Sequence, residues 1–499
     1  MDTRKAGAGP RRPPVARSRG LAALLLAASG FLASPGLGAQ ASPIPAAKAK
    51  PAAAAPAAGE RLVLGVEEAV AKALEGNLGL ASSRIDAGTK QRKYELAWNS
   101  FLPTVELGAT LGRFNKANEG SALVPASPIG GGLYDAVYPY SYSIRNVASA
   151  SLSAQLVLNA GLFEGIKGLR LDYEAGRIGY EQAVKQLERD VRKNFYSILL
   201  LEENMKLMER NIEAAERRYG QASANYRSGL APELTMLQAR VAWENMKPAL
   251  EEMRIGYAAS LDAFAMVLGL PRGTALDLDG SISPSYVAVD AGELLARRLG
   301  ERLDIRALEK SIDTMESTER ALRYQLQTPS LVLGWNADPA LSGDAFETGW
   351  FGKDAWEQSS GMFRITLSMR LNGLLPQSKE AQDLAELRDG IEKARSGLAQ
   401  ALRGAEIEVD DLARKLAKSR SSAAALALNV ELAERAYRLS EEAFRAGSKD
   451  LLDVQSDEIE LQKARLEVLK ENFNYVTGVL DLEYAVNLPF GSLDKEGTK

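Results

Sequence analysis

Long stretches of the chain carry apolar residues at alternating intervals of three and four positions. From about Leu162 to Arg227 this spacing continues through Val191, Phe195 and Ile198, and glycine is the only helix breaker in it. Spacing sustained over several heptads predicts coiled-coil helices, and a rise of about 1.5 Å per residue gives a length of roughly 100 Å. After a reversal at Gly229 the pattern returns to Pro271. We therefore predict a helical hairpin over residues 162–271.

The same hairpin pattern occurs a second time. Residues 215–271 align without a gap on residues 433–489 at a constant offset of 218. The alignment pairs Gly229 with Gly447 and Pro271 with Pro489, so the residues that reverse and stop the helices are repeated. This agreement indicates an internal duplication, and it predicts a second helical hairpin over residues 378–489.

Between the helical segments the period changes from three and four to two. Alternation of apolar and polar residues predicts strands at about 104–115, 148–158, 330–338 and 362–372. A helical pattern precedes the first two strands, from Leu62 to about Phe101, and another precedes the last two, from about Gly292 to Gln327. The fourth strand is the clearest, with Thr366 and Ser368 on its polar face and an unbroken apolar face. Its apolar residues are Phe363, Ile365, Leu367, Met369 and Leu371.

The pattern divides the chain into an exported leader and two repeats. Residues 1–39 combine a basic start with about a dozen apolar residues, too few to span a bilayer, and predict a signal peptide. Residues 40–60 are rich in Ala and Pro and predict a disordered linker. We assign residues 61–271 and 289–490 to the two repeats, 272–288 to a linker and 491–499 to a short tail.

Composition removes several classes of chemistry. The 499 residues include no His and no Cys, which excludes a Ser-His-Asp triad, His or thiolate metal sites and disulfides. The formal net charge of −4, without a basic stripe, argues against nucleic-acid binding. We expect no catalytic, cofactor or metal-binding residues and no enzyme, although chemistry by Ser, Lys or Asp is left open.

Four amphipathic strands in an exported chain need a partner for their apolar faces. They either pack on a small core or face lipid, and in lipid an open sheet edge would leave backbone groups unpaired. Lipid contact therefore requires a closed barrel. Membrane barrels begin at about eight strands, so four strands require several chains. We expect the apolar residues of the fourth strand to face lipid and Thr366 and Ser368 to face the lumen.

The chain from about residue 60 to 490 resembles the TolC family of outer-membrane efflux proteins. The residues that carry the resemblance are Glu67–Asn77, Leu102–Pro103, Tyr226–Gly229, Phe444–Gly447 and Leu452–Val454. The resemblance implies a mainly helical homotrimer in the outer membrane, with a twelve-stranded barrel and a periplasmic tunnel of twelve helices. It implies export of small molecules or proteins, together with a periplasmic adaptor and an inner-membrane pump. A periplasmic adaptor with one hairpin, or a coiled-coil scaffold without a pore, are the alternatives.

The resemblance also implies sites at the helix reversals. In the family, inter-helix links and carboxylate rings close the periplasmic end, and the tips contact the adaptor. Carried over by position, the gate residues are Asp453, Ser456, Thr235, Lys449 and Phe444. The adaptor contacts are Gly229, Leu230, Gly447 and Ser448. One of the three carboxylate positions is acidic here, so Asp453 is expected to form the ring and to favour cations.

Overall fold

A computed structural model describes most of the chain after the predicted linker. The described residues are 61–118, 122–123, 137–138, 144–341, 344–346, 349–351, 355–357, 361–446 and 448–493. The predicted signal peptide, the predicted disordered linker and Gly447 lie outside them.

The first segment is not the single helix that its pattern predicts. Its elements are β1 (Leu62–Leu64), α1 (Val66–Gly76), α2 (Leu78–Glu95) and the short 3₁₀ helix η1 (Ala97–Phe101). Strand β1 pairs in parallel with β6 (Leu276–Leu278), which lies in the predicted linker. The helix breaks at Asn77, because its side chain accepts the Leu80 N–H at 3.0 Å and donates to the Val267 carbonyl at 2.8 Å.

Two helical hairpins of equal dimensions form the largest part of the described chain. The first contains α3 (Gly161–Arg227) and α4 (Glu233–Val267), and the second contains α7 (Lys379–Arg445) and α8 (Leu451–Ala485). Helices α3 and α7 both have 67 residues, and α4 and α8 both have 35. Each helix of the second hairpin begins and ends 218 residues after its counterpart in the first hairpin. The most extensive buried cluster lies where α1, α3 and α4 meet, around Phe195 and Phe264.

The helical pattern before the second strand pair is also interrupted. It forms α5 (Ala291–Arg298), the 3₁₀ helix η2 (Leu299–Glu301) and α6 (Leu303–Gln327). The interruption falls at Arg302, whose ψ of 130° leaves the helical region. Its buried guanidinium donates to Asp304 and, at 2.8 Å, to Glu408 on α7, which fixes the chain in this conformation.

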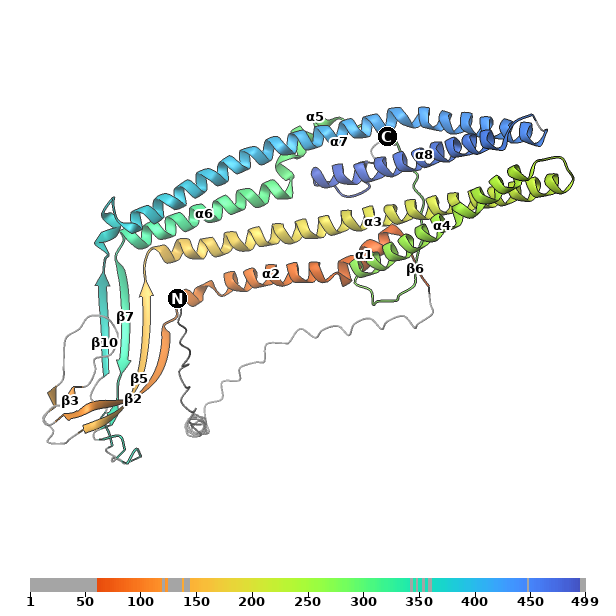
Figure 1. Ribbon diagram of the computed structural model, residues 1–499. Coiled ribbons are helices and arrows are strands. Elements are labelled where there is room, and N and C mark those ends of the chain that lie inside the picture. The colour runs from red at the N-terminus through yellow and green to blue at the C-terminus, as the bar shows by residue number, and fades with distance from the viewer. Residues whose placement is uncertain are drawn as a thin grey trace, which may run out of the picture. The chain divides into compact units, whose positions relative to one another are not determined.

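Four long antiparallel strands lie side by side in the order β2–β5–β7–β10 (Figure 1). Their bounds are Thr104–Asn118, Ile144–Leu158, Ser330–Ala337 and Gly361–Ser368. The short strands β3 (Ala122–Leu123) and β4 (Val137–Tyr138) pair with each other, while β8 (Ala340–Leu341) pairs with β5 and with β9 (Trp356–Glu357).

The fourth strand is shorter than its alternation predicts. It ends at Ser368, which pairs with Ser330, the first residue of β7. Residues beyond Ser368 have no ladder partner on β7, because Pro329 precedes that strand and cannot donate. Met369 and Leu371 therefore lie outside the strand, and Leu371 begins the 3₁₀ helix η3 (Leu371–Leu374).

Candidate functional site

The register of the sheet gathers the apolar residues of all four strands on one face. Leu107 lies opposite Leu152, and Leu156 and Ile365 both lie opposite Leu333. Opposed residues share a face, so the apolar surface is continuous from β2 to β10. It is also uncovered, since Leu107 is 81% exposed and Leu367 71% exposed. A patch of this extent on a folded chain marks a surface that contacts something apolar.

The opposite face of the same sheet is polar and hollowed. A hollow of about 480 Å³ lies over β5, β7 and β10. Thr366 and Ser368 line it, on the side of β10 opposite to Leu367. The remaining lining residues are Gln155, Val332, Gly334, Asn336, Arg364 and Arg370.

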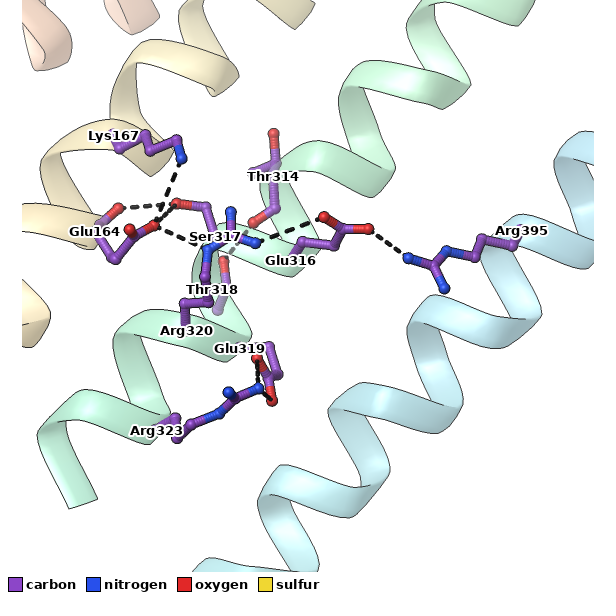
Figure 2. Close-up of polar contacts among 10 residues, drawn as sticks. All are labelled: Glu164, Lys167, Thr314, Glu316, Ser317, Thr318, Glu319, Arg320, Arg323 and Arg395. Atoms are coloured by element: carbon purple, nitrogen blue, oxygen red, sulfur yellow. Dashed lines mark hydrogen bonds and ion pairs between the residues drawn. The ribbon is translucent and has the colours of Figure 1, made fainter. Parts of the chain in front are cut away.

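A charged network joins the helices that adjoin the sheet in sequence (Figure 2). The Ser317 hydroxyl on α6 donates to the backbone carbonyl of Glu164 on α3 at 2.9 Å, and Arg320 donates to the Glu164 carboxylate at 3.2 Å. On the other side of α6, Glu316 accepts from Arg395 on α7 at 2.7 Å. Because α3 follows β5, α6 precedes β7 and α7 follows β10, these bonds fix three of the sheet's helical connections.

The best-buried carboxylate of this network is Glu319. It is 5% exposed and accepts hydrogen bonds from Arg323 on its own helix and from Arg388 on α7, the latter at 3.0 Å. Burial acts to raise the pKa of Glu319, but the two arginines outweigh it and the pKa lies below its ordinary value.

Replacing Glu319 with Gln should destabilise the chain at neutral pH and not in acid. A depressed pKa contributes stability above the unfolded-state pKa, and this stability is lost as the pH falls through the folded-state pKa. We expect the free energy of unfolding to fall by about 1 kcal/mol at pH 7. The loss is small for a charged hydrogen bond because both arginines reach water. Thermal unfolding of the detergent-solubilised protein, followed by its helical signal across pH, measures this difference.

The control for Glu319→Gln is Glu316→Gln on the same helix. Glu316 is more exposed, at 30% of its side chain, and a water-exposed pair contributes less. Equal effects of the two substitutions at pH 7, or an effect of Glu319→Gln that persists in acid, would contradict the prediction.

Both long helices end in the same type of turn. Gly229 has a φ of +72°, and the Leu230 N–H donates to the Asn225 carbonyl at 2.8 Å. The matching bond at the second reversal joins the Ser448 N–H to the Ala443 carbonyl at 2.9 Å. This Schellman pattern ends a helix by satisfying its last carbonyls. Leu230, at 80% exposure, and Ser448 lie on the surface.

The five predicted gate residues have different surroundings. Asp453 and Ser456 are exposed on α8, and Thr235 is half-buried on α4. Lys449 donates to Asp457 at 2.8 Å and to Ser440, within its own hairpin. Hydrogen bonds from Lys449 and Ser440 lower the pKa of Asp457.

Phe444 lies at an apolar cluster that includes residues of both hairpins. With Tyr219 it packs against a buried cluster made of Ala222 on α3, Ala239 on α4 and Leu451 on α8. This cluster joins the hairpins by apolar packing, whereas Lys449 makes its ion pair inside the second hairpin.

An ion pair that the sequence did not indicate also connects the two hairpins. Arg218 on α3 donates to the carboxylate of Glu458 on α8, and their side chains are only 7% and 6% exposed. Burial raises the pKa of Glu458 despite the opposing effect of Arg218. The pair borders a cavity of about 190 Å³. No signal in a single sequence identifies it, because a heptad pattern does not show where two hairpins bury a charge.

The described residues contain neither a metal-binding cluster nor a membrane-spanning helix. Nowhere in them do three or more His, Cys, Asp or Glu side chains gather in a way that could hold a metal ion. None of the helices in the same part of the chain combines the length and apolar character needed to cross a membrane.

Comparison with known proteins finds one matching family model and several solved structures of the same fold. Residues 69–270 match the family model described as outer membrane efflux protein, which confirms the resemblance inferred from the motifs. A comparison with curated proteins gave no match.

Several solved structures share the fold of this chain. A membrane protein from Pseudomonas aeruginosa has a TM-score of 0.66 at 16% identity, covering 84% of this chain and 92% of that one. The outer membrane protein VceC from Vibrio cholerae has a TM-score of 0.65 at 14% identity, with 85% and 96% covered. The CmeC outer membrane channel of Campylobacter jejuni has a TM-score of 0.64 at 16% identity, with 86% and 88% covered.

Proposed function

We infer that this chain, an outer membrane efflux protein by its match over residues 69–270, forms a passive exit duct through the outer membrane. The observation that carries this proposal is the two-faced sheet, with an exposed apolar face from β2 to β10 and a hollowed polar face behind it. A surface of this kind suits a wall with lipid on one side and water on the other.

The edges of the sheet support assembly from several chains. Strands β2 and β10 are each paired on one side within the described chain. Lipid cannot satisfy the free backbone groups of an edge, so the sheet has to close on further strands. We propose a homotrimer in which three four-stranded sheets form one twelve-stranded barrel, with the apolar faces of β2, β5, β7 and β10 toward lipid.

The helical hairpins are proposed to continue the duct into the periplasm. The two hairpins have equal helix lengths, which suits alternating positions in one tunnel wall. We propose that a periplasmic adaptor contacts the reversals at Gly229, Leu230, Gly447 and Ser448, and that an inner-membrane pump supplies small molecules or proteins. The exposed Leu230 offers an apolar contact at the first reversal.

Reconstitution tests the duct directly. The signal-cleaved protein should require detergent, migrate as a trimer and produce discrete single-channel currents in planar bilayers. A soluble monomer without detergent would favour the scaffold, and a detergent-requiring trimer that conducts no ions would exclude the duct.

Replacing Asp453 with Asn should weaken cation selectivity. Asp453 is exposed in the first turn of α8, and three copies around a trimer axis would concentrate negative charge at the gate. Single-channel reversal potentials in asymmetric salt should shift toward zero, and block by multivalent cations should weaken. Asp411→Asn on α7, where Asp411 pairs with Lys415, is the matched control. Unchanged selectivity would remove Asp453 from the pore.

A further inference from the structure

Near the helical end of the sheet, the charged residues that the structure describes on its polar face lie on the two edge strands. Glu106 lies on the polar face of β2, while Arg364 lies on that face of β10 and Arg370 follows two residues after its end. The interior strands carry no Asp, Glu, Lys or Arg between Asn146 and Leu158 on β5, or anywhere along β7. In the described part of the chain, none of the three charged residues takes part in an ion pair.

At this end of the sheet, the polar faces of the two edges carry opposite charges, which makes a β2 edge complementary to a β10 edge. Charges on an edge strand commonly prevent aggregation, and one sign on both edges would serve that purpose. Here, a β10 edge meeting another β10 edge in the antiparallel sense would bring the Arg364 side chains together, because Arg364 lies near the middle of that strand. Pairing β10 with β2 removes this repulsion and brings Glu106 to the same seam as the arginines. This arrangement is the heterologous contact from which a closed ring is built.

The complementary charges also lie at the same end of the sheet. Glu106 is the third residue of β2, which follows η1, and Arg370 lies between the end of β10 and η3. Both positions are therefore at the end where the strands connect to helical segments. Arg364 lies four residues before Arg370 and borders the same hollow.

We propose that Glu106 of one protomer pairs with Arg370, flanked by Arg364, of the next protomer across each seam of the barrel. The inference rests on the proposed barrel. It adds the side chains that determine which strand edges of neighbouring protomers pair. The partner is a second copy of this chain, and the charges favour head-to-tail joining of β10 to β2.

Charge reversal tests the seam. Glu106→Arg, and separately Arg364→Glu with Arg370→Glu, should each reduce the heat-resistant trimer in outer membranes by about tenfold, because like charges then face each other. Combining all three substitutions should restore the trimer. Ser151→Arg, which places the same charge on the polar face of interior strand β5, is the control for a general effect of lumenal charge. Unchanged trimer in both reversed variants, or no recovery in the combined one, would overturn the proposal.

Disulfide trapping gives a second test that does not depend on charge. The chain has no Cys, so Glu106→Cys with Arg370→Cys introduces the only thiols. If the two residues face each other, their Cα atoms lie within the roughly 7 Å that a disulfide spans, and oxidation should produce covalent trimers. Either cysteine alone should remain uncrosslinked. Conducting trimers without crosslinks would overturn the seam while leaving the duct intact, whereas a soluble chain would overturn the duct itself.

Discussion

Arginine in place of Leu367 should lower the amount of trimer in the outer membrane. Leu367 lies near the end of β10 on the apolar face, at 71% exposure, and lies opposite Leu331. An arginine that faces the bilayer midplane costs about 2–4 kcal/mol per copy and less toward the interface, and a trimer carries the cost three times. The measurement is the yield of heat-resistant trimer extracted from outer membranes.

The adjacent residue provides a matched control for Leu367→Arg. Thr366 lines the polar hollow on the opposite face, so Thr366→Arg introduces the same side chain one position away. Because successive residues of a strand point to opposite faces, this arginine should reach water and leave most of the trimer intact. Equal losses in the two variants, or normal trimer from Leu367→Arg, would contradict the proposed orientation of the sheet.

Arg218→Met should loosen the contact between the two hairpins. The substitution leaves Glu458 buried without a counter-charge, and breaking a buried ion pair typically costs about 3–5 kcal/mol. We expect a lower unfolding temperature in detergent and a larger or less stable single-channel conductance, because α3 and α8 lose their buried polar contact.

The companion of Arg218→Met is the double replacement with Glu458→Leu. Two apolar side chains can fill the site beside Leu451 and Met246, so much of the lost stability should return. The pH dependence provides a further check. Burial raises the pKa of Glu458, so this carboxyl is neutral in acid and becomes charged as the pH rises through that pKa. The stability that Arg218→Met loses should therefore be small in acid and larger at higher pH. A deficit independent of pH, or no recovery in the double variant, would show that packing and not charge is responsible.

The sequence predicts the parts of this fold that depend on repeated local patterns. The heptad spacing that ends at Arg227 and Arg445 locates both helix reversals, and the alternation around Ile365 assigns each residue to a face. Tertiary contacts decide the remainder. The break at Asn77 depends on the Val267 carbonyl, which lies 190 residues away in sequence.

The same limit applies to the candidate sites. The gate residues were placed by position from the reversals, and position alone does not show that Lys449 bonds to Asp457 inside its own hairpin. Nor does it show that Arg218 reaches Glu458, since these residues are 240 positions apart. The end of β10 at Ser368 depends on where its partner strand β7 begins. The alternation of residues along β10 alone gives no information about that partner.

The uncovered face of the sheet has a consequence for how the protein is made. A single chain in water would expose Leu107, Phe363 and Leu367 beside two free strand edges, which is a combination that favours aggregation. In the proposed barrel, folding of the strands and meeting of the chains would therefore be one event, with a rate that depends on concentration. We therefore expect the nascent chain to depend on a holding chaperone before that event, and slow delivery to the membrane to lower the yield more than a modest loss of helix stability.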